Sequence, residues 1–160
     1  MSSLDKIEVL PFTRSATEVA ALRRVAEQWQ REFKFWSFDE TLQVLQRSIC
    51  KAWYIPSRDE HSINIAAIVI VDIGPFEAEV LYIFVDAGYR AKGLGRHLLS
   101  WLVEHLRTFC AVEALFLEVR VSNTHAQRLY EQVGMQKIAM RKKYYANGED
   151  AFVYKLAIRH

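Results

Sequence analysis

Residues 80–96 read VLYIFVDAGYRAKGLGR and are the most informative stretch of this 160-residue chain. The stretch begins with a run of β-branched and aromatic residues, which predicts a strand, and it ends with two glycines among basic residues. An amphipathic run follows over residues 95–109, where Leu98, Leu102 and Leu106 share one stripe. We therefore expect a strand, a glycine-rich loop and a helix in direct succession.

The glycine-rich loop has the chemistry of an anion site. Glycines let backbone N–H groups approach a phosphate without a Cβ in the way, and a helix N-terminus carries about half a positive charge. Arg90, Lys92 and Arg96 add full positive charges. The loop is therefore predicted to hold two phosphates in a row.

Spacing separates this loop from two other phosphate-binding motifs. A P-loop requires Lys and then Ser or Thr after its second glycine, whereas Leu94 and Gly95 follow Gly93 here, so a P-loop is excluded. A dinucleotide fingerprint requires a third glycine where Leu98 stands, although Glu118 lies at a tolerable distance for the ribose carboxylate. On spacing alone, the dinucleotide interpretation is weak but open, and so is an ordinary loop before a surface helix.

The rest of the chain predicts the element order β-α-α-β-β-β-α-β-α-β-β. Ser15-Ala16-Thr17-Glu18 and Ser37-Phe38-Asp39-Glu40 both have the capping-box pattern that starts a helix. A helix between two strands requires a parallel crossover, whereas hairpins pair antiparallel, so the sheet should be mixed in an α+β fold. The predicted strands cover residues 7–12, 52–55, 65–71, 80–85, 115–119, 135–140 and 151–156.

Composition limits the function classes. A chain of this length fits a single domain over residues 1–160, and 51% hydrophobic with 25% charged residues is typical of folded proteins. A net charge of +2 is too small for a dedicated nucleic-acid binder. No apolar run approaches the roughly 18 residues of a membrane span, and MSSLDKIEVL lacks the build of a signal peptide. We expect a cytoplasmic protein with no direct nucleic-acid function, no membrane association and no metal site.

Two strings, RAKGLGRHLLSWL at residues 90–102 and LFLEVRVSNTHAQRLYEQVGM at residues 115–135, occur together in the chain. Together they resemble the signature of the GNAT N-acetyltransferases, in which [QR]-x-x-G-x-[GA] binds the pyrophosphate of acetyl-CoA. The match is continuous from Val80 onward, whereas before it the resemblance is limited to Phe35-Trp36-Ser37 and the element order. The chain is most similar to the ribosomal-protein alanine N-acetyltransferases (RimI-like), because it shares their strings over residues 118–123, 129–134 and 141–145.

The resemblance implies both a fold and a reaction. The fold would be a three-layer α+β sandwich whose twisted mixed sheet of about seven strands opens between the strands ending at Val85 and Val119. Acetyl-CoA would lie in that opening and be attacked directly, in a ternary complex, by the N-terminal α-amine of a small-subunit ribosomal protein. Alternative acceptors are a lysine, a polyamine or a small-molecule amine, and a non-catalytic CoA-binding module is a further alternative. The protein would be a monomer or a weak dimer.

The resemblance also assigns cofactor contacts. Backbone groups of Ile83, Phe84 and Val85 would pair with the pantetheine arm, and Asn123 would contact the cofactor. Phe84 is bulkier than the small residue usual in the family, so its ring would either narrow the acyl slot or fill the helix side of the sheet. The pyrophosphate would be held by Arg90, Ala91, Lys92, Gly93, Leu94, Gly95 and Arg96.

The same comparison implies that Glu118 is the general base and Tyr130 the proton donor to the CoA thiolate. An α-amine has a pKa of about 7.7 to 8.0 and a lysine about 10.4, so deprotonating lysine costs roughly 3 kcal/mol more. A single carboxylate base therefore suits an N-terminal acceptor better. Residues that would contact the acceptor are Trp36, Tyr144 and Tyr145.

Overall fold

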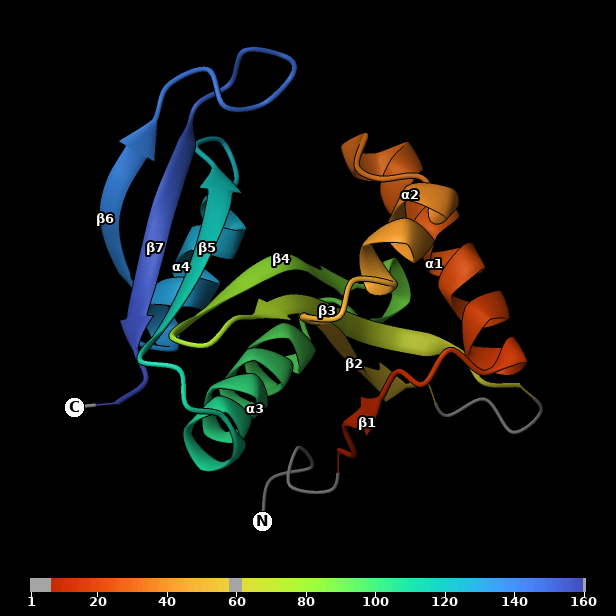
Figure 1. The fold of residues 1–160 in the computed structure, drawn as a ribbon. Coiled ribbons are helices and arrows are strands. Elements are labelled where there is room, and N and C mark those ends of the chain that lie inside the picture. Colours follow the sequence, from red (N-terminus) through yellow and green to blue (C-terminus); the bar gives the residue numbers. More distant parts are fainter. Residues whose placement is uncertain (1–6, 58–61, 160) are drawn as a thin grey trace.

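A seven-stranded sheet in the order β1-β2-β3-β4-β5-β7-β6 runs through the molecule. The computed structural model describes residues 7–57 and 62–159 (Figure 1). β4 and β5 pair in parallel and the other neighbours pair antiparallel, which confirms the expected mixed sheet of an α+β fold. The strands are β1 (Leu10–Pro11), β2 (Cys50–Pro56), β3 (Ile65–Ile73), β4 (Glu77–Val85), β5 (Ala114–Arg120), β6 (Gln136–Arg141) and β7 (Ala151–Ala157).

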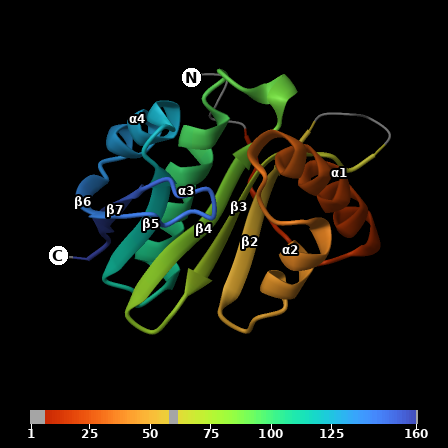
Figure 2. The same cartoon turned by 90° about the horizontal axis from the view of Figure 1, so that it is seen from above.

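Helices cover both faces of this sheet (Figures 1 and 2). One face packs under α1 (Ala16–Phe33) and α2 (Phe38–Leu45), around the fully buried Trp29. The other face packs under α3 (Leu94–Phe109) and α4 (Thr124–Gln132). Apolar side chains alternate along the strands between the two cores, as expected for a sheet that is buried on both sides.

Local sequence signals account for most element boundaries. Ser15 and Ser37 both form complete capping boxes at the starts of α1 and α2, as predicted. Gly134 follows α4 with a φ of 96°, a left-handed conformation that favours glycine. β1 is shorter than the predicted strand over residues 7–12, since only Leu10 and Pro11 pair with β2.

β4 and β5 diverge along their length, and this divergence positions the functional site. Their pairing runs from Glu77 opposite Ala114 only to Val80 opposite Leu117. β4 also carries a bulge against β3, because Ile70 pairs with Tyr82 and Val71 with Val80. Beyond these pairs β5 continues beside β7 (Figure 1), so the sheet opens where the sequence predicted it.

None of the helices in the two described ranges combines the length and apolar character that crossing a membrane requires. The expectation that the chain lacks a signal peptide rests partly on residues 1–6, which lie outside the described residues.

Candidate active site

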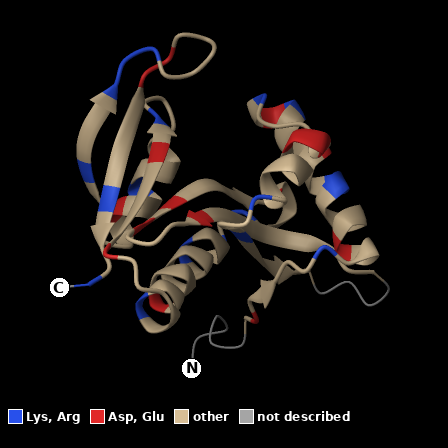
Figure 3. Cartoon of the chain, in the orientation of Figure 1, with Lys and Arg blue, Asp and Glu red and all other residues tan. Residues whose placement is uncertain are grey.

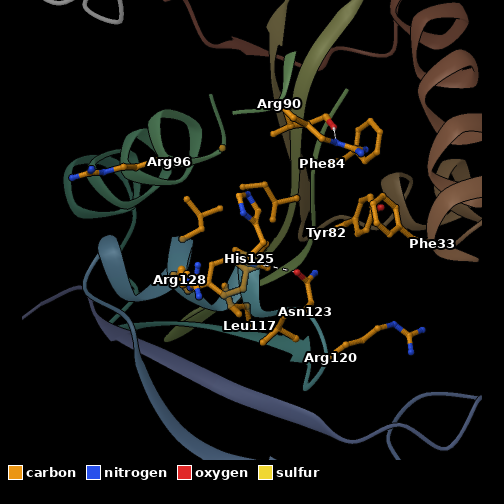
Figure 4. A pocket seen from close by; sticks show the side chains of 18 of the residues that line it. Phe33, Tyr82, Phe84, Arg90, Arg96, Leu117, Arg120, Asn123, His125 and Arg128 are labelled. Atoms are coloured by element: carbon orange, nitrogen blue, oxygen red, sulfur yellow. Dashed lines mark hydrogen bonds between the residues drawn. The ribbon is translucent and has the colours of Figure 1, made fainter. Parts of the chain in front are cut away.

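A cleft of about 700 Å³ lies where β4 and β5 diverge (Figure 4). Its walls come from β4, β5, the first turn of α3, α4 and the end of α1. A cavity of this size accommodates a drug-sized or larger ligand. Its lining includes four arginines, Arg90, Arg96, Arg120 and Arg128, against one carboxylate, Glu118, and this excess of positive charge favours an anionic ligand.

The first turn of α3 forms one end of the cleft. Gly93 is the N-cap of α3 and has a φ of 78°, and Ala91 before it has a φ of 59°. The first backbone N–H groups of a helix have no acceptor within the helix, so they are available to an anion. Gly95 serves close packing, since a Cβ there would lie 3.3 Å from Cδ2 of Leu129 and 3.5 Å from Cγ2 of Val85.

Two of the three loop cations that the sequence assigned to the pyrophosphate bind protein groups. Arg90 donates from Nε to the Val85 carbonyl at 3.0 Å, and its guanidinium pairs with Glu32 at 2.5 Å. Lys92 donates to the Gly88 carbonyl at 3.1 Å and does not line the cleft. The other residues of the predicted group, Ala91, Gly93, Leu94, Gly95 and Arg96, all line the cleft.

The segment of β4 beyond the bulge lines the cleft through Ile83, Phe84 and Val85. The Phe84 ring is 3% exposed and lies edge-on to Trp29, with 5.6 Å between ring centroids. It also lies edge-on to Phe33 at 6.3 Å. The bulk of Phe84 therefore fills the α1 side of the sheet, which is one of the two outcomes considered for this residue.

Glu118 projects from β5 into the cleft with 14% of its side chain exposed. Its carboxylate pairs with Arg141 at 2.8 Å, whereas Arg120 pairs with Glu149 at 3.0 Å. A hydrogen bond to the Glu118 carboxylate, together with partial burial, raises the pKa of the Tyr144 phenol to about 12. Glu118 is therefore held in place by Arg141 at the end of β6 and by Tyr144 in the β6–β7 loop, and not by Arg120, its neighbour along β5.

A second carboxylate stands near Glu118. Glu79 on β4 is opposite Phe116, two residues before Glu118 on β5, so the two glutamates are diagonal neighbours on one face. Burial raises the pKa of Glu79, and the negative charge of Glu118 raises it further. The sequence patterns did not single out Glu79, and they included Arg141 only as part of the string over residues 141–145.

Tyr130 lies on α4, lines the cleft and is 6% exposed. Its ring is 5.8 Å from that of Tyr154, centroid to centroid. Burial raises the pKa of the Tyr130 phenol, because the charged phenolate is disfavoured away from water. The hydroxyl therefore keeps its proton at neutral pH, as a proton donor requires.

Of the other residues to which the resemblance assigns a contact with the cofactor or acceptor, some line the cleft and some lie outside it. Asn123 lines the cleft and caps α4, since its Oδ1 accepts from the Ala126 N–H at 3.1 Å. Tyr145 also lines the cleft, but Trp36 and Tyr144 do not. The Trp36 carbonyl instead accepts from Nε1 of buried Trp29 at 2.7 Å, which ties the connection between α1 and α2 to α1.

The structure adds lining residues that the sequence patterns missed. Phe33 and Phe35 form an aromatic wall in which Phe35 stacks on Tyr82 at 4.1 Å between centroids. His125 and Arg128 belong to α4 and line the side of the cleft that lies opposite this aromatic wall. Their spacing of three residues on a predicted helix was a usable signal, because residues at i and i+3 share a face. Among residues 7–57 and 62–159, no group of His, Cys, Asp or Glu side chains could hold a metal ion.

Comparison with known proteins agrees with this geometry. The acetyltransferase (GNAT) family model matches residues 20–135. The ribosomal protein bS18-alanine N-acetyltransferase of Salmonella typhimurium is 35% identical over 131 residues, which cover 72% of this chain and 88% of that protein. The N-alpha-acetyltransferase RimI of Mycobacterium tuberculosis is 40% identical over 82 residues, which cover 51% of this chain and 49% of that protein.

A solved structure extends the similarity to the whole fold. The crystal structure of the ribosomal-protein-S18-alanine N-acetyltransferase from Escherichia coli has a TM-score of 0.77 at 30% identity and covers 96% of both chains. The chain spans about half or less of the length of the two mycobacterial relatives it matches. The family model alone matches more than half of the chain, over the segment that builds the cleft. The chain therefore belongs to the GNAT acetyltransferase family.

Proposed function

We propose that the protein transfers the acetyl group of acetyl-CoA to the N-terminal α-amine of a protein, with a small-subunit ribosomal protein as the acceptor. The observation that carries this proposal is the cleft between β4 and β5, which has a helix N-terminus at one end and a carboxylate with a buried phenol in its lining. Family membership supports acetyl-CoA as the donor. The names of the Salmonella and Escherichia coli relatives support a ribosomal-protein N-terminus as the acceptor.

The cleft fits the donor in shape and charge. Beyond Val80 the edge of β4 that faces β5 has no strand partner, so its backbone N–H and C=O groups can pair with the amides of an extended pantetheine arm. The diphosphate would lie at the first turn of α3, near Gly93. Acetyl-CoA would supply an acetyl group already activated as a thioester.

The reaction needs one proton acceptor and one proton donor. As the amine attacks, a C–N bond forms and the C–S bond breaks, without a covalent acyl-enzyme. Glu118 would take the proton from the attacking nitrogen, and Tyr130 would give its proton to the departing thiolate. A terminal amine is already partly neutral near pH 7, so a carboxylate base is sufficient.

The acceptor would enter between two aromatic segments. Phe35, in the α1–α2 connection, and Tyr82, on β4, line one side of the cleft. Tyr145, in the β6–β7 loop, lines another side. In Figure 1 both segments lie above β4, the β6–β7 loop toward the left and α2 toward the right. We also propose that the chain acts as a single domain in the cytoplasm, as a monomer or weak dimer, which sedimentation would test.

The function is tested with two peptide sets and acetyl-CoA, with products identified by mass. One set has free N-termini without lysine, and the other has blocked N-termini with one lysine. We expect products in the first set, and a loss of kcat of roughly 10² to 10⁴ in Glu118→Gln. Acetyl-CoA affinity should change less than twofold, and Glu104→Gln on α3 is the control with the same change of charge.

Two results would contradict the proposal in different ways. Products only on lysine side chains would show that the protein is an acetyltransferase but that its acceptor is lysine and not an N-terminal α-amine. Binding of acetyl-CoA by the wild type without turnover on any amine would favour a non-catalytic CoA-binding module.

A further inference from the structure

Most cations around the cleft are already engaged by protein groups. Arg90 binds Glu32 and the Val85 carbonyl, and Lys92 binds the Gly88 carbonyl. Arg120 pairs with Glu149 at 3.0 Å and packs its guanidinium over the Tyr145 ring at 3.9 Å. A guanidinium that is already paired contributes less to binding an incoming anion than a free one. The phosphates of the donor would therefore need another source of positive charge.

α4 supplies such a charge. Arg128 and His125 both line the cleft and lie three residues apart, so they share one face of the helix (Figure 4). Neither forms an ion pair with any residue in the described part of the chain. Arg96 also lines the cleft, but in Figure 4 its side chain extends away from His125 and Arg128.

Packing places Arg128 near the first turn of α3. Gly95 in that turn approaches Leu129 so closely that an added Cβ would lie 3.3 Å from Cδ2 of Leu129. Arg128 directly precedes Leu129 on α4. The turn of α4 that carries Arg128 therefore packs against the first turn of α3, and residues of both turns line the cleft.

We propose that Arg128, with His125 beside it, binds a phosphate group of coenzyme A next to the first turn of α3. The inference rests on the proposed donor. Coenzyme A carries phosphate groups at two places, in its diphosphate and at its 3′ position. A planar guanidinium can bind either with paired hydrogen bonds. The helical spacing of His125 and Arg128 lets both side chains reach one phosphate.

Calorimetric titration of the full chain with CoA and with dephospho-CoA, which lacks the 3′-phosphate, tests the inference without relying on turnover. Arg128→Gln should weaken CoA binding about tenfold or more, because a hydrogen-bonded charge is lost. Arg107→Gln, an equal change of charge at an exposed position of α3, should change it less than twofold. Arg128→Lys should recover part of the affinity, because it keeps the charge but not the paired geometry.

The two ligands identify which phosphate is bound. A loss with CoA but not with dephospho-CoA would assign Arg128 to the 3′-phosphate, and an equal loss with both would assign it to the diphosphate. If Arg128→Gln kept the circular dichroism spectrum of the wild type and bound both ligands equally well, the inference about Arg128 would be wrong and the proposed function would stand. A wild type that binds neither ligand would overturn the proposed function instead.

Discussion

Tyr130 shows how a single buried side chain supports the proposed chemistry. It is held on α4 between the cleft and Tyr154, and burial raises its pKa above the ordinary value near 10. The protonated form is the neutral one for tyrosine, so a raised pKa extends the range in which the proton is present. A proton donor of this kind stays active in alkaline solution.

This placement predicts a one-sided pH profile. kcat/KM for an N-terminal peptide should rise as the acceptor amine deprotonates near pH 7.7 to 8.0, and it should not fall again up to about pH 10. Tyr130→Phe should lower kcat by roughly tenfold or more at every pH in that range. A falling limb between pH 8 and 10 that disappears in Tyr130→Phe would show that Tyr130 ionises there and would contradict the prediction.

At the scale of elements, the carboxylate of Glu149 helps to attach the β6–β7 loop to the β5–α4 junction. Glu149 accepts hydrogen bonds from the N–H and hydroxyl of Ser122 and pairs with Arg120. The Ser122 bonds, followed by Arg120, lower the pKa of Glu149 to about 2. The loop carries Tyr144 and Tyr145 and follows Arg141, so this attachment also orients the residues around Glu118.

The Glu149 attachment predicts a pH-dependent stability difference. A carboxylate whose pKa is lower in the folded state stabilises the fold above its unfolded pKa, near 4.5, and loses that effect as pH falls through about 2. Glu149→Gln should therefore lower Tm at pH 7, and the difference from wild type should shrink between pH 4.5 and 2. Thermal melts over this range check it, with Glu104→Gln as the control. A Tm difference that is constant with pH would contradict the assignment.

At the scale of the whole molecule, the open sheet separates two packed halves. α1 and α2 with β1–β4 lie to one side of the opening between β4 and β5, and β5–β7 with α4 lie to the other (Figure 3). The two sides meet through the short parallel pairing of β4 with β5 and through α3. A ligand that bridges the opening would stabilise this arrangement.

Ligand linkage predicts how much stability CoA adds. At a concentration 100 times its Kd, CoA should raise the free energy of unfolding by about 2.7 kcal/mol. Hydrogen exchange should slow in residues 81–85 of β4 and in the first turn of α3, and it should not change in β6 at the far edge of the sheet. Protection confined to β6 would place the ligand outside the cleft.

The sequence by itself determined the order of elements, the two capped helices and the strand, loop and helix around Gly93. These features depend on side-chain periodicity and on backbone groups a few residues apart, which are present in the chain before it folds. The resemblance in residues 90–135 then predicted the family and the opening of the sheet. The starts of α1 and α2 agreed with the structure because each is set by a local capping box.

Only the tertiary structure decided which side chains share the cleft. Arg90 meets Glu32 across 58 positions of sequence, and Arg141 reaches Glu118 from the end of β6. Such pairs depend on how helices and loops pack over the sheet, and no local pattern records that packing. For the same reason Arg128, which no motif singled out, lines the cleft, while Lys92, which the loop motif included, does not.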